Sequence, residues 1–208
     1  MVTAAQLRES FATTRAPVDL LDVVMPPGAE RWPDGMRERL SSTLKPAAVL
    51  IPLVERGVAD LNLLLTQRSA ELKTHAGQVS FPGGRMEPGD ADIAGTALRE
   101  TEEEVGIRQS GVSVIGFLDP MPTITGYAVT SVVGIVEADY QLDIDRTEVE
   151  YVFEVPLSFL MDSSNRRLVD REYLDSSFKM VEYHYKDERI WGATAFIIEK
   201  FIEIIRKQ

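Results

Sequence analysis

Residues 81–90 read FPGGRMEPGD, and the acidic segment RETEEEVGI follows at residues 99–107. At about 100° per residue, a helix through the second part brings Glu100, Glu103 and Glu104 within one turn on one face. Such carboxylate pairs repel by roughly 0.2–0.5 kcal/mol each on an isolated helix, so a scaffold helix gains nothing from them. A divalent cation would remove the repulsion, because carboxylate oxygens are ligands that Mg²⁺ and Mn²⁺ prefer. The stretch therefore predicts a metal-phosphate site.

The same segment has the apolar spacing of a helix that packs on a core. Ala94, Leu98, Thr101 and Val105 follow one another at intervals of four, three and four residues, which places them on one stripe. Gly106 stands where the C-cap of such a helix is expected. We therefore predict a helix that ends at Gly106 and presents its acidic residues away from this stripe.

A run of acidic residues such as 102–104 is most often a solvated surface, and taken alone it would favour that interpretation. The loop at residues 81–84 argues against it, since Gly83 and Gly84 allow positive φ and a close approach of the backbone to a ligand. Together the loop and the acidic helix favour a binding site.

These residues resemble the box of the Nudix hydrolase family, G-x5-E-x7-R-E-U-x-E-E-x-G-U with U aliphatic. Residues 99–107 match its second half, except that Thr101 stands where an aliphatic residue is usual. The first half fits if the loop is one residue longer, as Gly84-x5-Asp90-x8-Arg99. Asp90 then takes the place of the family's Glu.

A second motif is similar to the coenzyme A pyrophosphatase branch of this family. The run LLTQRS at residues 64–69 leads through Lys73 and Gly77 to residues 81–84, and the branch tolerates a longer Nudix loop. Lys73 replaces the branch's arginine, which keeps the charge and loses the bidentate fork. The resemblance implies substrate contacts, which we assign to Arg68, Ser69, Lys73, Gly83 and Gly84.

The resemblance also implies roles for the acidic residues and a Mg²⁺ or Mn²⁺ cofactor. Glu100 and Glu104 are expected to bind the cation, with the Gly84 carbonyl as a further candidate. Glu103 is either another ligand or the base that orients water, and spacing does not decide between these roles. For Arg99 we expect an i,i+4 pair with Glu103 that orients the carboxylates.

Other candidate residues lie later or earlier in the chain. Glu148 begins a stretch that resembles the branch's E-V-x-x-V-F-x-V-P-L, and it is either a catalytic acid or a charge at a strand edge. His75 lies inside the branch motif, where it is either structural or a substrate contact. The turn at residues 123–127 either borders the pocket or simply connects two strands.

Composition limits the class of protein. The 208 residues suffice for one sizeable core. The absence of cysteine excludes disulfides, thiolate zinc sites and a cysteine nucleophile, and it fits a reducing, cytoplasmic location. The first residues lack the apolar core of a secretory signal, and no apolar run reaches the roughly 20 residues of a membrane helix. The net charge of −11 disfavours nucleic acid as a partner.

Hydrophobic periodicity gives the remaining elements. Helices are predicted at Gln6–Thr14, Met36–Leu44 and Ala195–Arg206. Strands are predicted at residues 48–54, 61–65, 112–117, 129–136, 149–155 and 178–185, with a turn at residues 56–57. We expect an N-terminal helical extension over residues 1–45, packed on a Nudix hydrolase domain over residues 46–208.

The fold expected from these elements is α/β, with a mixed sheet between helical layers and extra N-terminal helices. The Nudix resemblance implies the same α/β/α sandwich. A homodimer is compatible with it.

Three functions remain open. The first is a divalent-metal-dependent pyrophosphohydrolase that cleaves coenzyme A to 3′,5′-ADP and 4′-phosphopantetheine. The second keeps this chemistry on ADP-ribose, NADH, a dinucleoside polyphosphate or capped RNA. The third is a Nudix module that senses a nucleotide without cleaving it, and the presence of all three glutamates disfavours it. The small-molecule substrate expected in the first two is a nucleoside diphosphate derivative.

Overall fold

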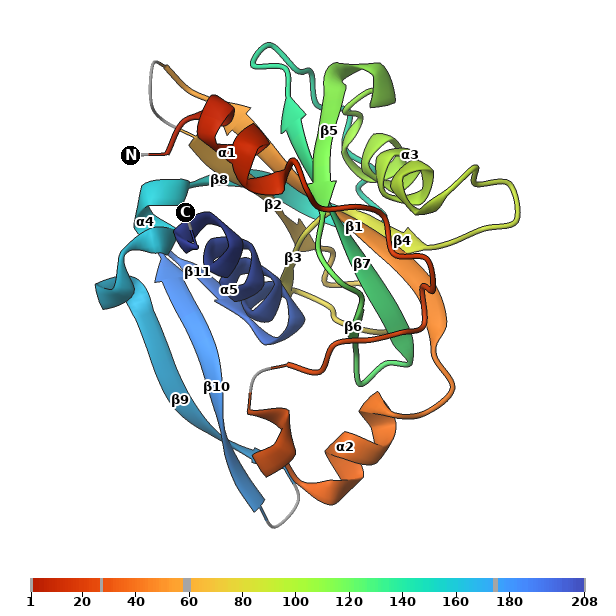
Figure 1. The fold of residues 1–208 in the computed structure, drawn as a ribbon, viewed down its shortest axis with the longest axis vertical. Coiled ribbons are helices and arrows are strands. Elements are labelled where there is room, and N and C mark those ends of the chain that lie inside the picture. The colour runs from red at the N-terminus through yellow and green to blue at the C-terminus, as the bar shows by residue number, and fades with distance from the viewer. Residues whose placement is uncertain (1, 27, 58–60, 174–175, 208) are drawn as a thin grey trace.

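The computed structural model describes residues 2–26, 28–57, 61–173 and 176–207. The elements within these ranges are shown in Figure 1. The helices are α1 (Ala4–Phe11), α2 (Asp34–Leu40), α3 (Ile93–Val105), α4 (Leu157–Met161) and α5 (Gly192–Arg206). The strands are β1 (Lys45–Glu55), β2 (Leu61–Arg68), β3 (Val79–Ser80), β4 (Gly83–Arg85), β5 (Val112–Phe117), β6 (Met121–Pro122), β7 (Tyr127–Val136), β8 (Val149–Pro156), β9 (Arg166–Tyr173), β10 (Ser176–Tyr185) and β11 (Glu188–Trp191).

The central sheet is mixed, as predicted. Its main path runs β3-β2-β1-β7-β5, while β4 pairs with β1, β6 with β7 and β8 with β2. Only β1 and β7 are parallel, with Leu50 opposite Val132, and every other pairing observed in this sheet is antiparallel. A parallel pair needs a long crossover, and here that connection contains α3.

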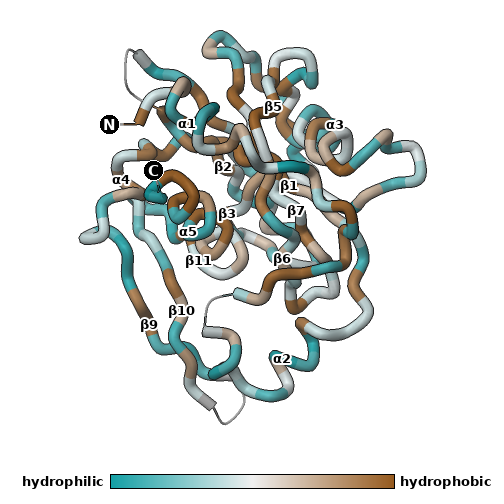
Figure 2. The backbone as a smooth tube through the Cα atoms, viewed as in Figure 1, coloured by the Kyte–Doolittle hydropathy of each residue, from teal (hydrophilic) through white to brown (hydrophobic). Residues whose placement is uncertain are grey.

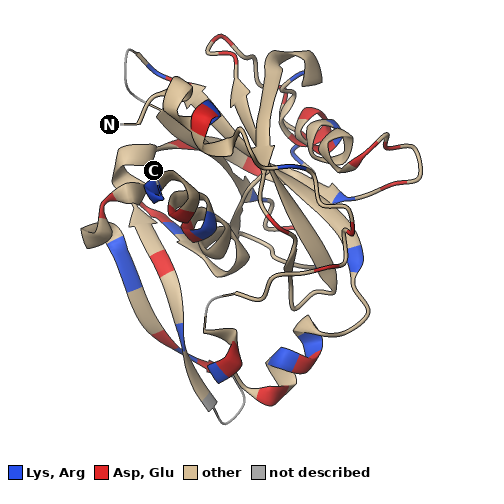
Figure 3. Cartoon of the chain, in the orientation of Figure 1, with Lys and Arg blue, Asp and Glu red and all other residues tan. Residues whose placement is uncertain are grey.

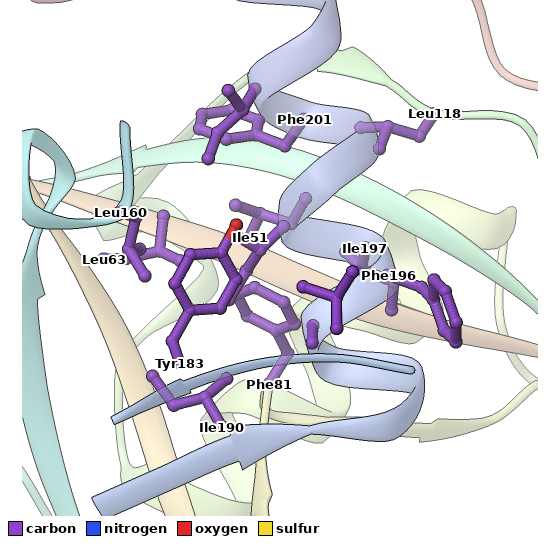
Figure 4. Packing of buried hydrophobic residues seen from close by; sticks show 14 of the residues in the cluster. Ile51, Leu63, Phe81, Leu118, Leu160, Tyr183, Ile190, Phe196, Ile197 and Phe201 are labelled. Carbon is purple, nitrogen blue, oxygen red and sulfur yellow. The ribbon is translucent and has the colours of Figure 1, made fainter. Parts of the chain in front are cut away.

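Alternation along β1 divides the core into two layers. Ala48 and Leu50 point to the side that α3 covers, while Ile51 and Leu53 point to the side that α5 and α1 cover. Figure 4 shows Ile51 among the side chains packed around α5. Figure 2 shows hydrophobic residues concentrated in the central strands and in α5. The predicted α/β/α sandwich is therefore confirmed.

The N-terminal segment contributes directly to the larger layer. The two predicted helices are present but begin and end earlier than expected, since α1 ends at Phe11 rather than Thr14 and α2 at Leu40 rather than Leu44. A capping box formed by Thr3 and Gln6 starts α1, and Pro33 precedes α2. Phe11 stacks on Phe201 of α5 with ring centroids 5.5 Å apart. The first strand then begins at Lys45.

A three-stranded antiparallel sheet, β9-β10-β11, was predicted only in part. The strand predicted at residues 178–185 is confirmed as β10, whereas β9 was not expected. Its sequence, RRLVDREY, lacks an apolar alternation. The strand pairs antiparallel with β10, and ion pairs accompany this ladder, including Arg171 with Glu182 at 2.7 Å and Lys179 with Asp170 at 3.0 Å.

Candidate active site

Helix α3 carries the acidic residues, and its buried face differs from the predicted stripe. Ala94 and Leu98 are only half-buried, whereas Ile93 and Ala97 are buried in their place. The buried stripe is thus rotated by one residue at the start of the helix. The end of the helix is as predicted, with Gly106 in the left-handed conformation. This rotation turns Glu104 inward, and the acidic face is visible as the red segments of α3 in Figure 3.

Glu104 is the buried acid of the site, with 3% of its side chain exposed. One oxygen accepts a hydrogen bond from the Gly83 N–H at 3.1 Å, and the other lies 3.5 Å from an Arg68 nitrogen. Glu103 projects about 100° away on the helix and is 59% exposed. Neighbouring glutamates therefore occupy different environments.

Both glycines of β4 lie where β1 and α3 come close to the strand. Gly83 has φ 152°, and a Cβ there would overlap the Ala48 carbonyl. A Cβ on Gly84 would overlap the Glu100 carboxylate. The absence of side chains lets the backbone touch the acidic face of α3, which places the Gly83 N–H against Glu104.

Arg99 forms hydrogen bonds with three of the acidic residues. Its guanidinium donates to both oxygens of Asp90, at 2.7 and 3.0 Å, and to Glu100 and Glu103 at 2.9 Å each. Asp90 also accepts hydrogen bonds from the Thr96 hydroxyl and a backbone N–H. These bonds, led by that of Arg99, hold the pKa of Asp90 far below its ordinary value. The expected Arg99–Glu103 pair is present, and Asp90 fixes the arginine from the other side.

The three glutamates do not converge on one point as we predicted from helical spacing. Across the described ranges, no three acidic or histidine side chains are arranged to hold a metal ion as they stand. The reason is that Arg99 draws Glu100 and Glu103 toward itself, while Glu104 is turned toward Gly83.

The electrostatics of the site nevertheless favour a cation. Burial raises the pKa of Glu104 to about 7 against the opposing effects of Arg68 and the Gly83 N–H, and the charges of Glu148 and Glu100 raise it further. Burial also raises the pKa of Glu100, and the charge of Glu148 contributes. The charge of Glu148 thus acts on both carboxylates. This set of hard oxygen donors with mutual repulsion fits a divalent cation.

The branch motif places some predicted contacts at the site and others away from it. Arg68 ends β2 beside β8, and the Ser69 N–H donates to the Glu148 carbonyl at 2.8 Å. Lys73 is exposed and forms no ion pair with any residue that the structure describes. His75 has φ 57°, its ring contacts Gln78 at 2.9 Å, and the residue also lines an apolar cavity, so its position fits both expected roles.

An apolar cavity of about 300 Å³ opens beside these residues and was not predicted. Arg68 and Gly83 line it, as do Thr123 and Thr125 of the loop that we expected either to border the pocket or simply to connect strands. The first of those alternatives is correct. Side chains of α2 form another wall, which sequence could not reveal because helix α2 reaches the cavity only through tertiary packing.

Comparison with known proteins agrees with this site. Residues 44–175 match the model of the NUDIX domain. The chain belongs to the Nudix hydrolase family. A protein of Photorhabdus laumondii described as "Uncharacterized Nudix hydrolase NudL" is 41% identical over 81% of this chain and 89% of its own length. A protein of the same description from Escherichia coli O1:K1 is 45% identical over 74% and 79%.

Among solved structures, the MutT protein from Methanosarcina mazei Go1 aligns over 79% of this chain and 94% of its own, with a TM-score of 0.48 and 19% identity. The predicted enzyme class, a Nudix pyrophosphatase acting on phosphorus anhydrides, is confirmed by the family match and the named relatives. Nudix hydrolases use divalent metal ions, consistent with the acidic site. None of the helices found in the described ranges is long and apolar enough to cross a membrane.

Proposed function

We propose that this Nudix hydrolase cleaves coenzyme A or its derivatives to 3′,5′-ADP and 4′-phosphopantetheine, with Mg²⁺ or Mn²⁺. The proposal rests on one observation, namely that an acidic surface and an apolar surface share a boundary. The acidic residues around Glu104 meet the apolar cavity at Arg68 and Gly83. A substrate with a diphosphate next to a weakly polar arm matches both surfaces at once.

Each of these residues then has its own role in the reaction. Glu100 and Glu104 would hold the cation, which neutralises charge on the non-bridging phosphate oxygens. A water oxygen forms a bond to one phosphorus, the bond to the bridging oxygen breaks, and the departing phosphate carries that oxygen. Glu103 or Glu148 takes the proton of the water. Arg99, fixed by Asp90, positions Glu100 and Glu103.

The substrate contacts that we propose follow the same geometry. Arg68 lies at the boundary of both surfaces, and its Nε atom is buried without a hydrogen-bond partner in the described part of the chain. A phosphate oxygen would satisfy it. We propose Ser69, Gly83 and Gly84 as further substrate contacts, and of these Gly83 lines the cavity together with Arg68. Lys73, the remaining candidate, is exposed.

A second candidate is another nucleoside diphosphate derivative, such as ADP-ribose, NADH, a dinucleoside polyphosphate or capped RNA. The observation that favours it is the departure at Lys73, an exposed residue where the coenzyme A branch has arginine. A purely sensory module is disfavoured, since Glu104 remains buried beside other acids at a cost that binding alone does not require.

The test is a panel of these substrates incubated with the protein and either Mg²⁺ or Mn²⁺, with products identified by mass. The proposal expects 3′,5′-ADP and 4′-phosphopantetheine, and no products with excess chelator. Efficient cleavage of another substrate while coenzyme A survives would refute it. Base assignment follows from Glu103→Gln and Glu148→Gln, since loss of the base lowers kcat more than it raises KM.

A further inference from the structure

Two arginines share one buried carboxylate on the sheet formed by β9, β10 and β11. One oxygen of Glu182 lies 2.7 Å from a nitrogen of Arg171 and 2.8 Å from a nitrogen of Arg189. Its other oxygen lies 2.8 Å from the Nε2 atom of His184. Figure 3 shows acidic and basic segments side by side along β9 and β10. Glu182 therefore holds both guanidinium groups in place.

The two arginines have more hydrogen-bond donors than this carboxylate can accept. A guanidinium presents several N–H groups in a fixed fork, and a carboxylate has only two oxygens. Arg171 donates to Glu182 through one terminal nitrogen, and its Nε atom is buried without a hydrogen-bond partner in the described part of the chain. Neither Arg171 nor Arg189 pairs with another acid among the residues that the structure describes. The pair thus keeps a positive charge that Glu182 does not neutralise.

A ligand can reach both guanidinium groups from solvent. The side chains of Arg171 and Arg189 are 34% and 38% exposed, whereas that of Glu182 is 7% exposed. A ligand would therefore meet the positive groups before the buried acid. The net charge of the chain is −11, so an open pair of arginines with surplus charge gives anions a local point of attraction.

The arginine pair borders the apolar cavity on the side of β10 and β11. Side chains two residues apart on a strand share a face, so Met180 and Glu182 point to the same side of β10. Trp191 lies opposite Glu182 in the register of β11, and both Met180 and Trp191 line the cavity. The central carbon of the Arg189 guanidinium is 4.9 Å from the centre of the Trp191 ring. An anion bound by the arginines would lie at the edge of the cavity that also meets the acidic site.

We propose that Arg171 and Arg189 bind a phosphomonoester that the substrate carries apart from its diphosphate. The free oxygens of such a group accept several N–H donors at once, and the planar fork of arginine fits them in pairs. In coenzyme A this group is the 3′-phosphate, which stays on the product 3′,5′-ADP. The inference rests on the proposed function and deepens it, because ADP-ribose and NADH lack such a group and would lose this contact.

Binding without hydrolysis tests the anion site. Calorimetric titration of the full chain with excess chelator compares 3′,5′-ADP, 5′-AMP and inorganic phosphate. We expect 3′,5′-ADP to bind roughly 10- to 100-fold more tightly than 5′-AMP, and this preference to fall roughly tenfold in Arg171→Gln and in Arg189→Gln. Equal binding of the two nucleotides by the wild type would overturn the inference. Inorganic phosphate that binds as tightly as 3′,5′-ADP would assign the site to free phosphate and also overturn it.

Lys179→Gln is the matched control for the loss of a positive charge. Lys179 belongs to the same sheet, but its odd position in β10 places it on the face opposite to Glu182, where it pairs with Asp170. This variant should keep the wild-type preference for 3′,5′-ADP. Either arginine variant leaves Glu182 with the other arginine and His184 as partners. Thermal melting of each variant verifies folding.

Kinetics distinguish substrate recognition from a purely structural role. The 3′-phosphate is not bonded to the phosphorus that reacts, so its contact should lower KM rather than raise kcat. We expect both arginine variants to raise KM for coenzyme A roughly tenfold and to leave KM for 3′-dephospho-coenzyme A unchanged. A structural role would raise both KM values equally, and that result would overturn the inference.

The outcomes also separate this inference from the proposed function. If coenzyme A is not hydrolysed but 3′,5′-ADP still binds more tightly than 5′-AMP only with both arginines in place, the proposed function fails and the anion site stands. If coenzyme A is hydrolysed and the folded arginine variants keep the wild-type ratio of KM values for coenzyme A and its dephospho form, the proposed function stands and the anion site is overturned.

Discussion

The two long helices that cover the central sheet, α3 and α5, have opposite compositions. The buried residues of α5 are largely isoleucine and phenylalanine, and they belong to the larger core cluster. Helix α3 buries Thr96, Thr101 and Glu104 beside a few aliphatic residues, and its own cluster is small. One helix thus contributes mainly apolar burial, whereas the other keeps a buried acid.

This difference indicates that the two helices have different roles, with α5 stabilising the fold and α3 carrying the candidate catalytic residues. A buried carboxylate beside other acids lowers stability unless a cation or donor compensates it. We therefore expect substitutions under α5 to unfold the protein, and substitutions on the acidic face of α3 to stop catalysis while the protein stays folded.

The largest effect is expected for Phe201→Ala in α5. Phe201 is fully buried and stacks on Phe11, so its truncation should cost about 3–5 kcal/mol of unfolding free energy. The melting temperature should fall by roughly 6–20 °C. Glu203→Ala, a more exposed change on the same helix, is the control. Equal melting temperatures for the two variants in calorimetry would contradict this account of α5.

A smaller effect is expected for Asp90→Asn on the other side of the sheet. The variant removes the charge that fixes Arg99 and should lower kcat/KM by roughly 10- to 100-fold. Glu87→Ala is the control, since among the residues that the structure describes its carboxylate pairs only with the exposed Arg85, at 3.5 Å. Unchanged kinetics in Asp90→Asn would show that Arg99 is positioned without it.

The pH dependence of stability gives a third comparison on the α3 side. Burial alone would raise the pKa of Glu154, but hydrogen bonds from Arg56, Asn62 and Tyr140 outweigh it and lower the pKa from 4.5 to about 2. The stability from this charge is complete above pH 4.5 and is lost as the pH falls toward 2. Glu154→Gln should thus be less stable than wild type at neutral pH, with a gap that closes in acid. Urea unfolding across this range measures it, and a gap independent of pH would refute the assignment.

The smallest effect is expected for Thr101→Val. The Thr101 side chain is buried, and its hydroxyl already donates to the Ala97 carbonyl of the same helix at 2.6 Å. Replacing it by an aliphatic residue, as the family pattern has, should change the unfolding free energy by less than about 1 kcal/mol and leave kcat unchanged. A large loss of activity would give Thr101 a role that its position does not explain.

Much of the fold was predictable because its signals are local. The apolar runs of β1 and β7, the periodicity of α5 and the cap at Gly106 all depend on nearby residues, and the structure confirms them. The strand β9 was not predictable, because its sequence lacks an apolar alternation and its backbone pairing with β10 is visible only in the folded structure.

The sequence indicated candidate site residues but not how their side chains are arranged. The motif spacing identified Glu100, Glu103, Glu104 and Arg99, but helical spacing could not show that Arg99 pulls two of the acids aside. The position of Asp90 in the motif indicated a role for this residue. Its hydrogen bonds with Arg99, however, are visible only in the folded structure. The cavity wall formed by α2 had no local signal at all.

The most direct test of these different roles is the hydrolysis of coenzyme A by Glu104→Gln, measured with Mg²⁺ or Mn²⁺ beside a melting curve of the same sample. We predict at least a roughly hundredfold loss of kcat/KM with an equal or higher melting temperature, because the neutral side chain removes a buried charge and still accepts the Gly83 N–H. The exposed Glu102→Gln on the same helix should behave as wild type. Full activity in Glu104→Gln, or a loss that appears only together with unfolding, would contradict the account.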